Sequence, residues 1–173
     1  MSTISIKELS HPSGEVIKIA SGKTLDLKSS GSVTMPTGSV LQVVSALYTT
    51  QTATSGGTYI DSGITLPITP SSTSSKIFVM VTFGGFEMSS GRAAMYTNLV
   101  RGSTQVYQPN GYVGTPSGSL RTLPATSYNF LDSPATTSET TYKVQFKGAG
   151  SAGSVTLNVN ASESTITLME IQG

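Results

Sequence analysis

Apolar pairs recur every eight residues near the start of the chain, and this repeat limits what the segment can fold into. One polar residue separates the two members of each pair, and turn-forming residues such as Ser21 and Gly22 lie between pairs. Alternation of this kind predicts short strands with one apolar and one polar face. The pairs are Ile17 and Ile19, Leu25 and Leu27, Val33 and Met35, and Leu41 and Val43.

Strands this short cannot bury their apolar faces within one chain. Small repeat units are stable only when they stack, and a closed arrangement without free edges needs more strands than one chain offers here. Three chains wound around one another would provide them. The sequence therefore predicts a short intertwined trimeric β stem over residues 16–43, with the apolar residues of the pairs as its core.

The composition disfavours several kinds of function. The 173 residues include ten basic and nine acidic side chains, so no strong net charge attracts the chain to a nucleic acid. The absence of cysteine excludes disulfides and cysteine-based zinc sites. Residues 1–10 contain no continuous apolar segment, so neither a signal peptide nor a membrane anchor is expected. The sequence predicts no cofactor, no nucleic-acid partner and no membrane insertion.

Residues 44–173 contain many short strand patterns separated by turns. Lys76–Phe83 is apolar at nearly every position, which predicts a strand that is buried on both faces or lies at a subunit interface. Thr140–Lys147 alternates between apolar and polar residues, as a half-buried strand does. Tyr59–Asp61 and Ile64–Thr69 are predicted as two short strands divided by a turn. The predicted fold class is all-β, with an antiparallel jelly-roll-like β-sandwich after the stem.

Catalytic and metal-binding groups are sparse. The single histidine, His11, lies in a predicted turn near the chain start, so a catalytic triad is not expected. The carboxylates are scattered rather than paired as glycoside hydrolysis requires. Asp132 is predicted to cap a turn, and Glu170 to face a basic partner at a subunit contact. The sequence thus predicts no enzyme and no metal site, although His11 or Asp26 could converge on a trimer axis.

The longest predicted surface loop, residues 108–119, is rich in residue types that bind sugars. Aromatic rings can cover sugar faces, amide and guanidinium groups can bond to sugar hydroxyls, and loops on rigid scaffolds often carry recognition. The candidate receptor-binding residues are Tyr107, Asn110, Tyr112 and Arg121, with Tyr128 and Asn129 as alternatives.

Five stretches carry a resemblance to a known group of proteins. They are SGKTLDLKSSGSVTMPTGSVLQVV (21–44), ITPSSTSSKIFVMV (68–81), LVRGST (99–104), FLDSPATTSETTYKVQ (130–145) and STITLMEI (164–171). These stretches resemble tail-fibre and related virion structural proteins of tailed bacteriophages, notably those of aquatic and cyanobacterial phages. The resemblance implies a homotrimer whose C-terminal knob is similar to trimeric C1q-like and tumour-necrosis-factor-like domains.

The resemblance also implies a function. The slender N-terminal part would be fixed to phage tail or baseplate proteins, and the knob, residues 44–173, would adhere to the bacterial surface, where a glycan is the expected receptor. Residues 1–15 would then be a docking leader, through Ile4, Ile6 and Leu9, or a frayed terminus. The protein would be made in the host cytoplasm and located in the virion tail. A head-decoration or tail-connector trimer without receptor binding, and a glycan-trimming tail enzyme, stay open as alternatives.

Overall fold

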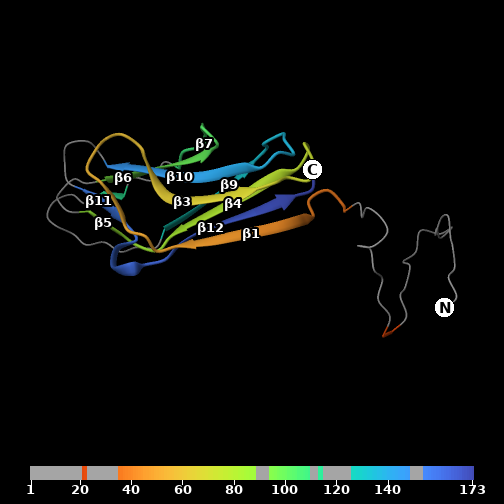
Figure 1. Ribbon diagram of the computed structural model, residues 1–173, viewed down its shortest axis with the longest axis horizontal. Coiled ribbons are helices and arrows are strands. Elements are labelled where there is room, and N and C mark those ends of the chain that lie inside the picture. Colours follow the sequence, from red (N-terminus) through yellow and green to blue (C-terminus); the bar gives the residue numbers. More distant parts are fainter. Residues whose placement is uncertain (1–20, 23–34, 89–93, 110–112, 115–125, 149–153) are drawn as a thin grey trace. The chain divides into compact units, whose positions relative to one another are not determined.

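The computed structural model of the chain describes residues 21–22, 35–88, 94–109, 113–114, 126–148 and 154–173. The chain divides into two units, residues 1–34 and Met35–Gly173, and almost all described residues belong to the second. In that unit the described residues form β-strands joined by turns, with one short 3-10 helix (Figure 1).

A four-stranded antiparallel sheet contains the first and the last strand of this unit, in the order β1-β12-β4-β9. Its strands are β1 (Val40–Tyr48), β12 (Ser164–Ile171), β4 (Lys76–Phe83) and β9 (Thr126–Asp132). Two backbone hydrogen bonds, from Gly38 to Gln172 and from Gln172 to Ser39, join the start of β1 to the end of the chain. The segment that enters the sandwich and the last residues of the chain therefore lie at the same end of this sheet.

A five-stranded antiparallel sheet faces the first one (Figure 1). Its main path runs β3-β10-β6-β7, and β8 pairs with β6 beside that path. Its strands are β3 (Ile60–Ile68), β10 (Thr140–Gly148), β6 (Ala94–Arg101), β7 (Thr104–Tyr107) and β8 (Val113–Gly114). Gly102, with a φ of 58°, makes the tight turn between β6 and β7.

A third, smaller sheet has the order β2-β11-β5. Its strands are β2 (Thr52–Thr54), β11 (Val155–Leu157) and β5 (Phe86–Met88), and the 3-10 helix η1 (Val159–Ala161) follows β11. The buried side chain of Asn158 donates to the carbonyl of Thr50 at 3.0 Å and accepts from the hydroxyl of Ser164. These bonds hold the turn after β11 against the start of β12.

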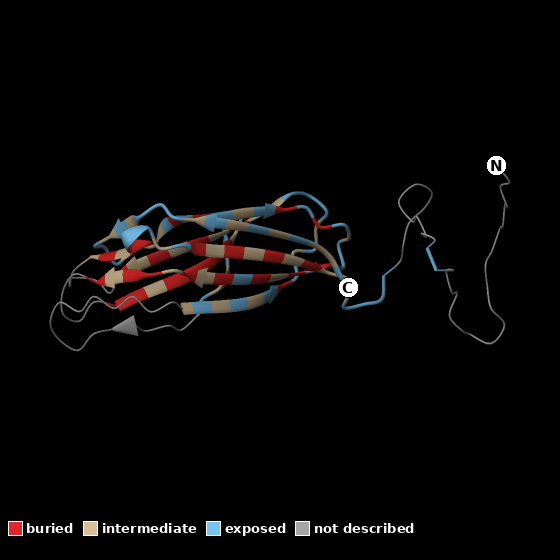
Figure 2. Ribbon diagram, turned by 90° about the horizontal axis from the view of Figure 1, so that it is seen from below, coloured by how far each residue is buried: buried red, intermediate tan, exposed pale blue. Residues whose placement is uncertain are grey.

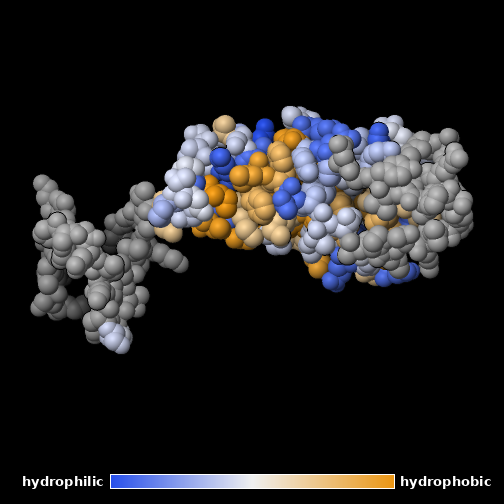
Figure 3. Space-filling view, turned by 180° about the vertical axis from the view of Figure 1, so that it is seen from behind, coloured by the Kyte–Doolittle hydropathy of each residue, from blue (hydrophilic) through white to orange (hydrophobic). Residues whose placement is uncertain are grey.

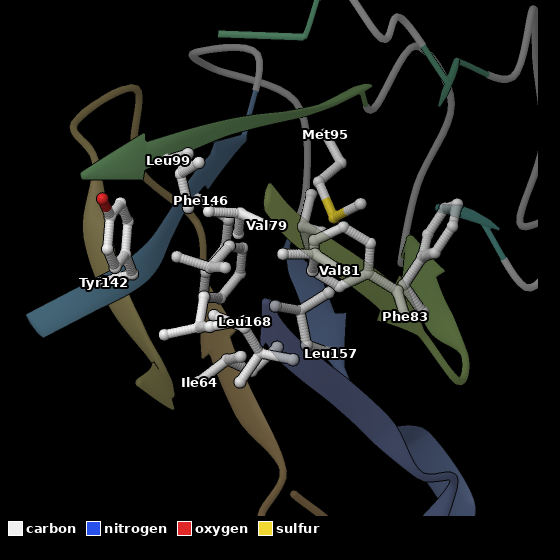
Figure 4. Close-up of a cluster of buried hydrophobic side chains, with 14 of the residues drawn as sticks. Ile64, Val79, Val81, Phe83, Met95, Leu99, Tyr142, Phe146, Leu157 and Leu168 are labelled. Atoms are coloured by element: carbon white, nitrogen blue, oxygen red, sulfur yellow. The ribbon is translucent and has the colours of Figure 1, made fainter. Parts of the chain in front are cut away.

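The facing sides of the two larger sheets form the hydrophobic core. Along most strands, buried side chains alternate with more exposed ones, as the banding in Figure 2 shows, whereas β6 is buried at nearly every position. Full burial of one such apolar side chain stabilises the fold by roughly 1.5–3 kcal/mol. Core residues from both sheets and from β11 are Ile64, Val79, Val81, Phe83, Met95, Leu99, Tyr142, Phe146, Leu157 and Leu168 (Figure 4). The predicted all-β, jelly-roll-like sandwich is confirmed, whereas the stem up to residue 34 lies outside the described residues apart from 21–22.

One predicted element is wrong. The two short strands expected around residues 62 and 63 are a single strand, β3, which pairs with β10 on both sides of these positions. Gly63 has a φ of 87°, and the pairing register shifts between Lys143 and Gln145 opposite it. The glycine therefore makes a bulge within the strand, where the sequence pattern suggested a turn.

Candidate assembly surface

The outer face of the four-stranded sheet carries exposed apolar side chains. Strand register identifies the outward-facing positions, because alternate residues point to opposite sides of a sheet. Five of the six large hydrophobic side chains that are exposed in the described part of the chain lie on this face. They are Val40, Val43, Leu47, Met80 and Leu131, with exposed fractions of 49%, 54%, 53%, 41% and 48%. Figure 3 shows hydrophobic side chains gathered on one side of the sandwich.

The pairing register arranges this face in rows that cross all four strands. The first row contains Val43, Met169, Phe78 and Leu131. The second row contains Ser45, Thr167, Met80 and Asn129, and the third contains Leu47, Thr165, Thr82 and Ser127. We call these rows, together with Val40, the apolar face. None of the residues in these three rows is charged, and the row that contains Val43 is entirely apolar. The row of Val40 continues through Ile171 to the exposed Lys76, so one charge lies at this edge of the sheet.

A face of this composition is suited to contact with another protein surface. Outward positions of a sandwich are normally polar, and a large exposed apolar patch marks an interaction site. Strand spacing and rise give the sheet about 19 Å by 26 Å, or about 500 Å² in projection. One partner in a standard protein interface contributes about 800 Å² of accessible surface, which is of the same order. Covering the exposed half of each valine or leucine would contribute roughly 1 kcal/mol per side chain.

The outer face of the five-stranded sheet has the opposite character. Lys143 donates to Asp61 at 2.9 Å and Gln145 donates to the same carboxylate at 2.7 Å, all on outward positions of β10 and β3. Hydrogen bonds from Gln145 and Lys143 lower the pKa of the Asp61 carboxyl below its usual value. The sandwich therefore has one apolar and one polar outer face.

Asp132 connects the two large sheets. It ends β9, is buried, and accepts hydrogen bonds from the hydroxyl of Tyr142 and the guanidinium of Arg101, each at 2.6 Å. Burial, followed by the hydrogen bond and charge of Asp132, raises the pKa of the Tyr142 hydroxyl well above its usual value. The predicted turn-cap role of Asp132 is wrong, because the side chain points into the sandwich, toward β6 and β10.

Glu170 is also buried, with 1% of its surface exposed, and its partners are neutral. Its carboxylate accepts from the backbone and hydroxyl of Ser71 at 2.7 and 2.6 Å, and from the side chain of Gln42 at 2.6 Å. Burial opposes ionisation, but the hydrogen bonds from Ser71 and Gln42 hold the pKa of Glu170 below its usual value. The prediction that Glu170 meets a basic partner at a subunit contact is wrong, because its own chain satisfies it.

The structure gives part of the surroundings of the predicted receptor-binding residues. Tyr107 ends β7, and its ring stacks on Phe130 at 4.9 Å between centroids, so one ring face is covered. Burial raises the pKa of Tyr128, whose buried hydroxyl has no hydrogen-bond partner, and Asn129 is exposed on the apolar face. The other candidates, Asn110, Tyr112 and Arg121, lie outside the described residues. The receptor site that these residues would form stays a prediction.

The predicted stem and docking residues fall mostly outside the described part of the chain. Met35 precedes β1 and is 40% exposed, whereas Leu41 and Val43 lie within β1 as part of the sandwich. Val43 pairs with Met169 of β12, and Leu41 falls at the register shift between Val40 and Gln42. Val43 thus contributes to the apolar face. The remaining stem and docking residues are Ile4, Ile6, Leu9, Ile17, Ile19, Leu25, Leu27 and Val33, all outside the described residues.

The described residues contain neither a group of metal ligands nor a membrane-spanning helix. No three of their histidine and acidic side chains are grouped as metal ligands would be. None of the described helical segments has the length and apolar character needed to cross a bilayer.

In sequence, the chain matches no protein-family model and no curated protein. In structure, it is similar to the VP2 subviral particle of infectious bursal disease virus, with a TM-score of 0.44, 14% identity, and coverage of 87% of this chain and 42% of that one. It is also similar to T=1 particles derived from that virus, with a TM-score of 0.44, 14% identity, and coverage of 87% and 41%. The chain thus spans less than half of these proteins, and the similarity extends to no functional property.

Proposed function

We propose that the chain is a phage virion structural protein, a homotrimeric tail fibre whose N-terminal residues are docked to the particle and whose sandwich adheres to the host surface. The apolar face carries this proposal. It leaves Val43, Leu47, Met80 and Leu131 in water unless a partner covers them. The absence of charge on its three four-residue rows favours an apolar partner, and sister copies of this face offer one.

The proposal of three copies is based on the eight-residue repeat of apolar pairs in the sequence. The apolar pairs of residues 17–35 need additional strands, which three wound chains would supply, and β1 follows directly in the chain. If three copies pack their apolar faces together, the three sandwiches form one knob. The polar faces would then point outward, three to each fibre.

Adhesion would come from repetition rather than from one strong site. Several equal surfaces on one particle convert weak contacts with bacterial surface glycans into firm attachment through effective concentration. The polar outer faces are the surfaces that such an assembly leaves accessible. A head-decoration or connector trimer would use the same apolar face without a receptor.

Native mass spectrometry of the full chain tests the assembly. We expect a trimer, and we expect Val43→Asp and Met80→Asp to shift the mass toward the monomer because each places a charge on the apolar face. Thr104→Asp, at an exposed position on β7, is the matched control and should leave the trimer intact. Val43→Thr keeps the β-branched shape and should weaken the trimer in a variant that still folds. A monomeric parent protein, or a trimer unaffected by all three apolar-face changes, would overturn the proposal.

Phage particles test the tail-fibre role. Labelled antibody should locate the protein at the tail in electron micrographs, and deletion of residues 1–15 should prevent its incorporation. Label over the head, or normal incorporation of the shortened chain, would favour the decoration alternative.

A further inference from the structure

A second group of side chains lies on the outer face of the five-stranded sheet. Lys147 and Tyr96 are paired neighbours on β10 and β6, and both point away from the core. The ammonium group of Lys147 lies 4.7 Å from the ring centroid of Tyr59 and 5.4 Å from that of Tyr96. The amide of Gln108 donates to the hydroxyl of Tyr59 at 3.0 Å. We call these four residues the tyrosine–lysine cluster.

The cluster spans the sheet rather than one strand. Tyr59 precedes β3 and Gln108 follows β7, and these strands lie on opposite sides of β10 and β6 in the sheet order. Their hydrogen bond therefore crosses the outer face above the two central strands. Gln105 continues the network, since its amide donates to Gln108 at 3.3 Å.

Among the described residues, no carboxylate forms an ion pair with the ammonium group of Lys147. Within the described part of the chain, the ion pairs join Arg101 to Asp132 and Lys143 to Asp61, and none includes Lys147. Two tyrosine rings stabilise a cation but leave its charge uncompensated. An anionic group is therefore the ligand chemistry that this position favours.

A buried acceptor lies on the same face. Asn98 is two residues from Tyr96 on β6, is only 3% exposed, and its side-chain oxygen has no hydrogen-bond partner. Such an unpaired acceptor costs roughly 1–3 kcal/mol, which a hydroxyl donor can recover. Alternate positions of β6 share a side of the sheet, so the side chain of Asn98 lies on the face that carries the tyrosine–lysine cluster.

We propose that the tyrosine–lysine cluster binds an acidic carbohydrate, a sugar whose carboxylate meets Lys147, whose ring contacts Tyr96 and Tyr59, and whose hydroxyl donates to Asn98. The proposal rests on the adhesive role proposed above and names the chemical class of the receptor. It uses different residues from the loop around Asn110 and Tyr112. A free anion such as phosphate would satisfy the charge of Lys147 but would leave the rings and Asn98 without a partner.

Calorimetric titration of the full-length protein, in its native assembly, tests the proposal. Trigalacturonate should bind, maltotriose should bind at least about tenfold more weakly, and inorganic phosphate should not displace trigalacturonate at equal concentration. Lys147→Gln should weaken trigalacturonate binding about tenfold, whereas Lys147→Arg should largely preserve it. Added salt should weaken the binding because a charge contact contributes.

Lys143→Gln is the matched control, because Lys143 lies on the same strand and face but is paired with Asp61. It should change the affinity by less than about twofold. No binding of trigalacturonate, equal binding of maltotriose, or equal effects of the two lysine changes would overturn the proposal. Native mass measured on the same samples separates this failure from failure of assembly, since a trimer that binds no acidic sugar refutes only the ligand.

Discussion

Glu170 and Asp132 flank Ile77 on the inner face of the four-stranded sheet, and the chain satisfies each carboxylate differently. Glu170 depends on neutral donors, so Glu170→Gln removes an acceptor and should lower the free energy of unfolding at pH 7 by about 1–3 kcal/mol. The pKa of the Glu170 carboxyl is lower in the folded protein than in the unfolded chain, where it is about 4.3. The ionised carboxylate therefore stabilises the fold above pH 4.3, and this stabilisation is lost as the pH falls through the pKa of the folded protein. Urea unfolding of both proteins should therefore differ at pH 7 and converge in acid.

The exposed Glu139 provides the control for this measurement. Glu139→Gln should leave the free energy of unfolding close to that of the parent protein at each pH. A stability gap for Glu170→Gln that stays constant from pH 7 into acid would contradict the role given to the ionised carboxylate.

Asp132 depends on a cation and a phenol from the opposite sheet. Asp132→Asn should lower the free energy of unfolding by about 2–4 kcal/mol, because the buried bonds from Arg101 and Tyr142 lose their charged acceptor. Asp61→Asn breaks a more exposed pair with Lys143 and should cost less than about 1 kcal/mol. Thermal or urea unfolding ranks the two variants. Equal losses in the free energy of unfolding would mean that the buried bonds between the sheets stabilise the fold no more than the exposed pair does.

At the scale of elements, the link between β4 and β5 depends on a glycine. A Cβ at Gly84 would collide with the backbone carbonyl of Glu163, which leads into β12. Gly84→Ala should therefore separate these segments and lower the free energy of unfolding by about 1–3 kcal/mol. Gly56→Ala meets nothing closer than 3.8 Å and is the control. Urea unfolding measures both, and a neutral Gly84→Ala would show that the two segments can move apart freely.

For the whole molecule, coupling between assembly and folding makes stability depend on concentration. If the apolar face is buried between copies, the midpoint of thermal unfolding should increase with protein concentration. Val43→Thr should lower that midpoint by about 2–4 °C for each 1 kcal/mol of stabilisation lost with the buried apolar surface. The decrease should be largest at protein concentrations at which the parent protein is assembled. Calorimetry over a wide range of concentrations tests this, and a midpoint independent of concentration would contradict the coupling.

The sequence alone determined the all-β class and most strand positions, because a period of two and turn residues are local properties. Lys76–Phe83 and Thr140–Lys147 were predicted nearly to their ends, whereas Gly63 was misjudged because a bulge and a turn share the same residue type. Apolar residues on both sides of β4 already suggested a subunit contact, but one strand does not define a face.

Only the tertiary structure decided which residues share a surface. The register of four strands placed Val43, Phe78 and Leu131 in one row, although they are distant in the chain. Sheet order likewise brought Tyr59 and Gln108 together across two central strands. Hydrogen bonds between strands are made by backbone groups that all residues share, so sequence specifies their pairing only weakly, and the surfaces that bind partners appear once that pairing is fixed.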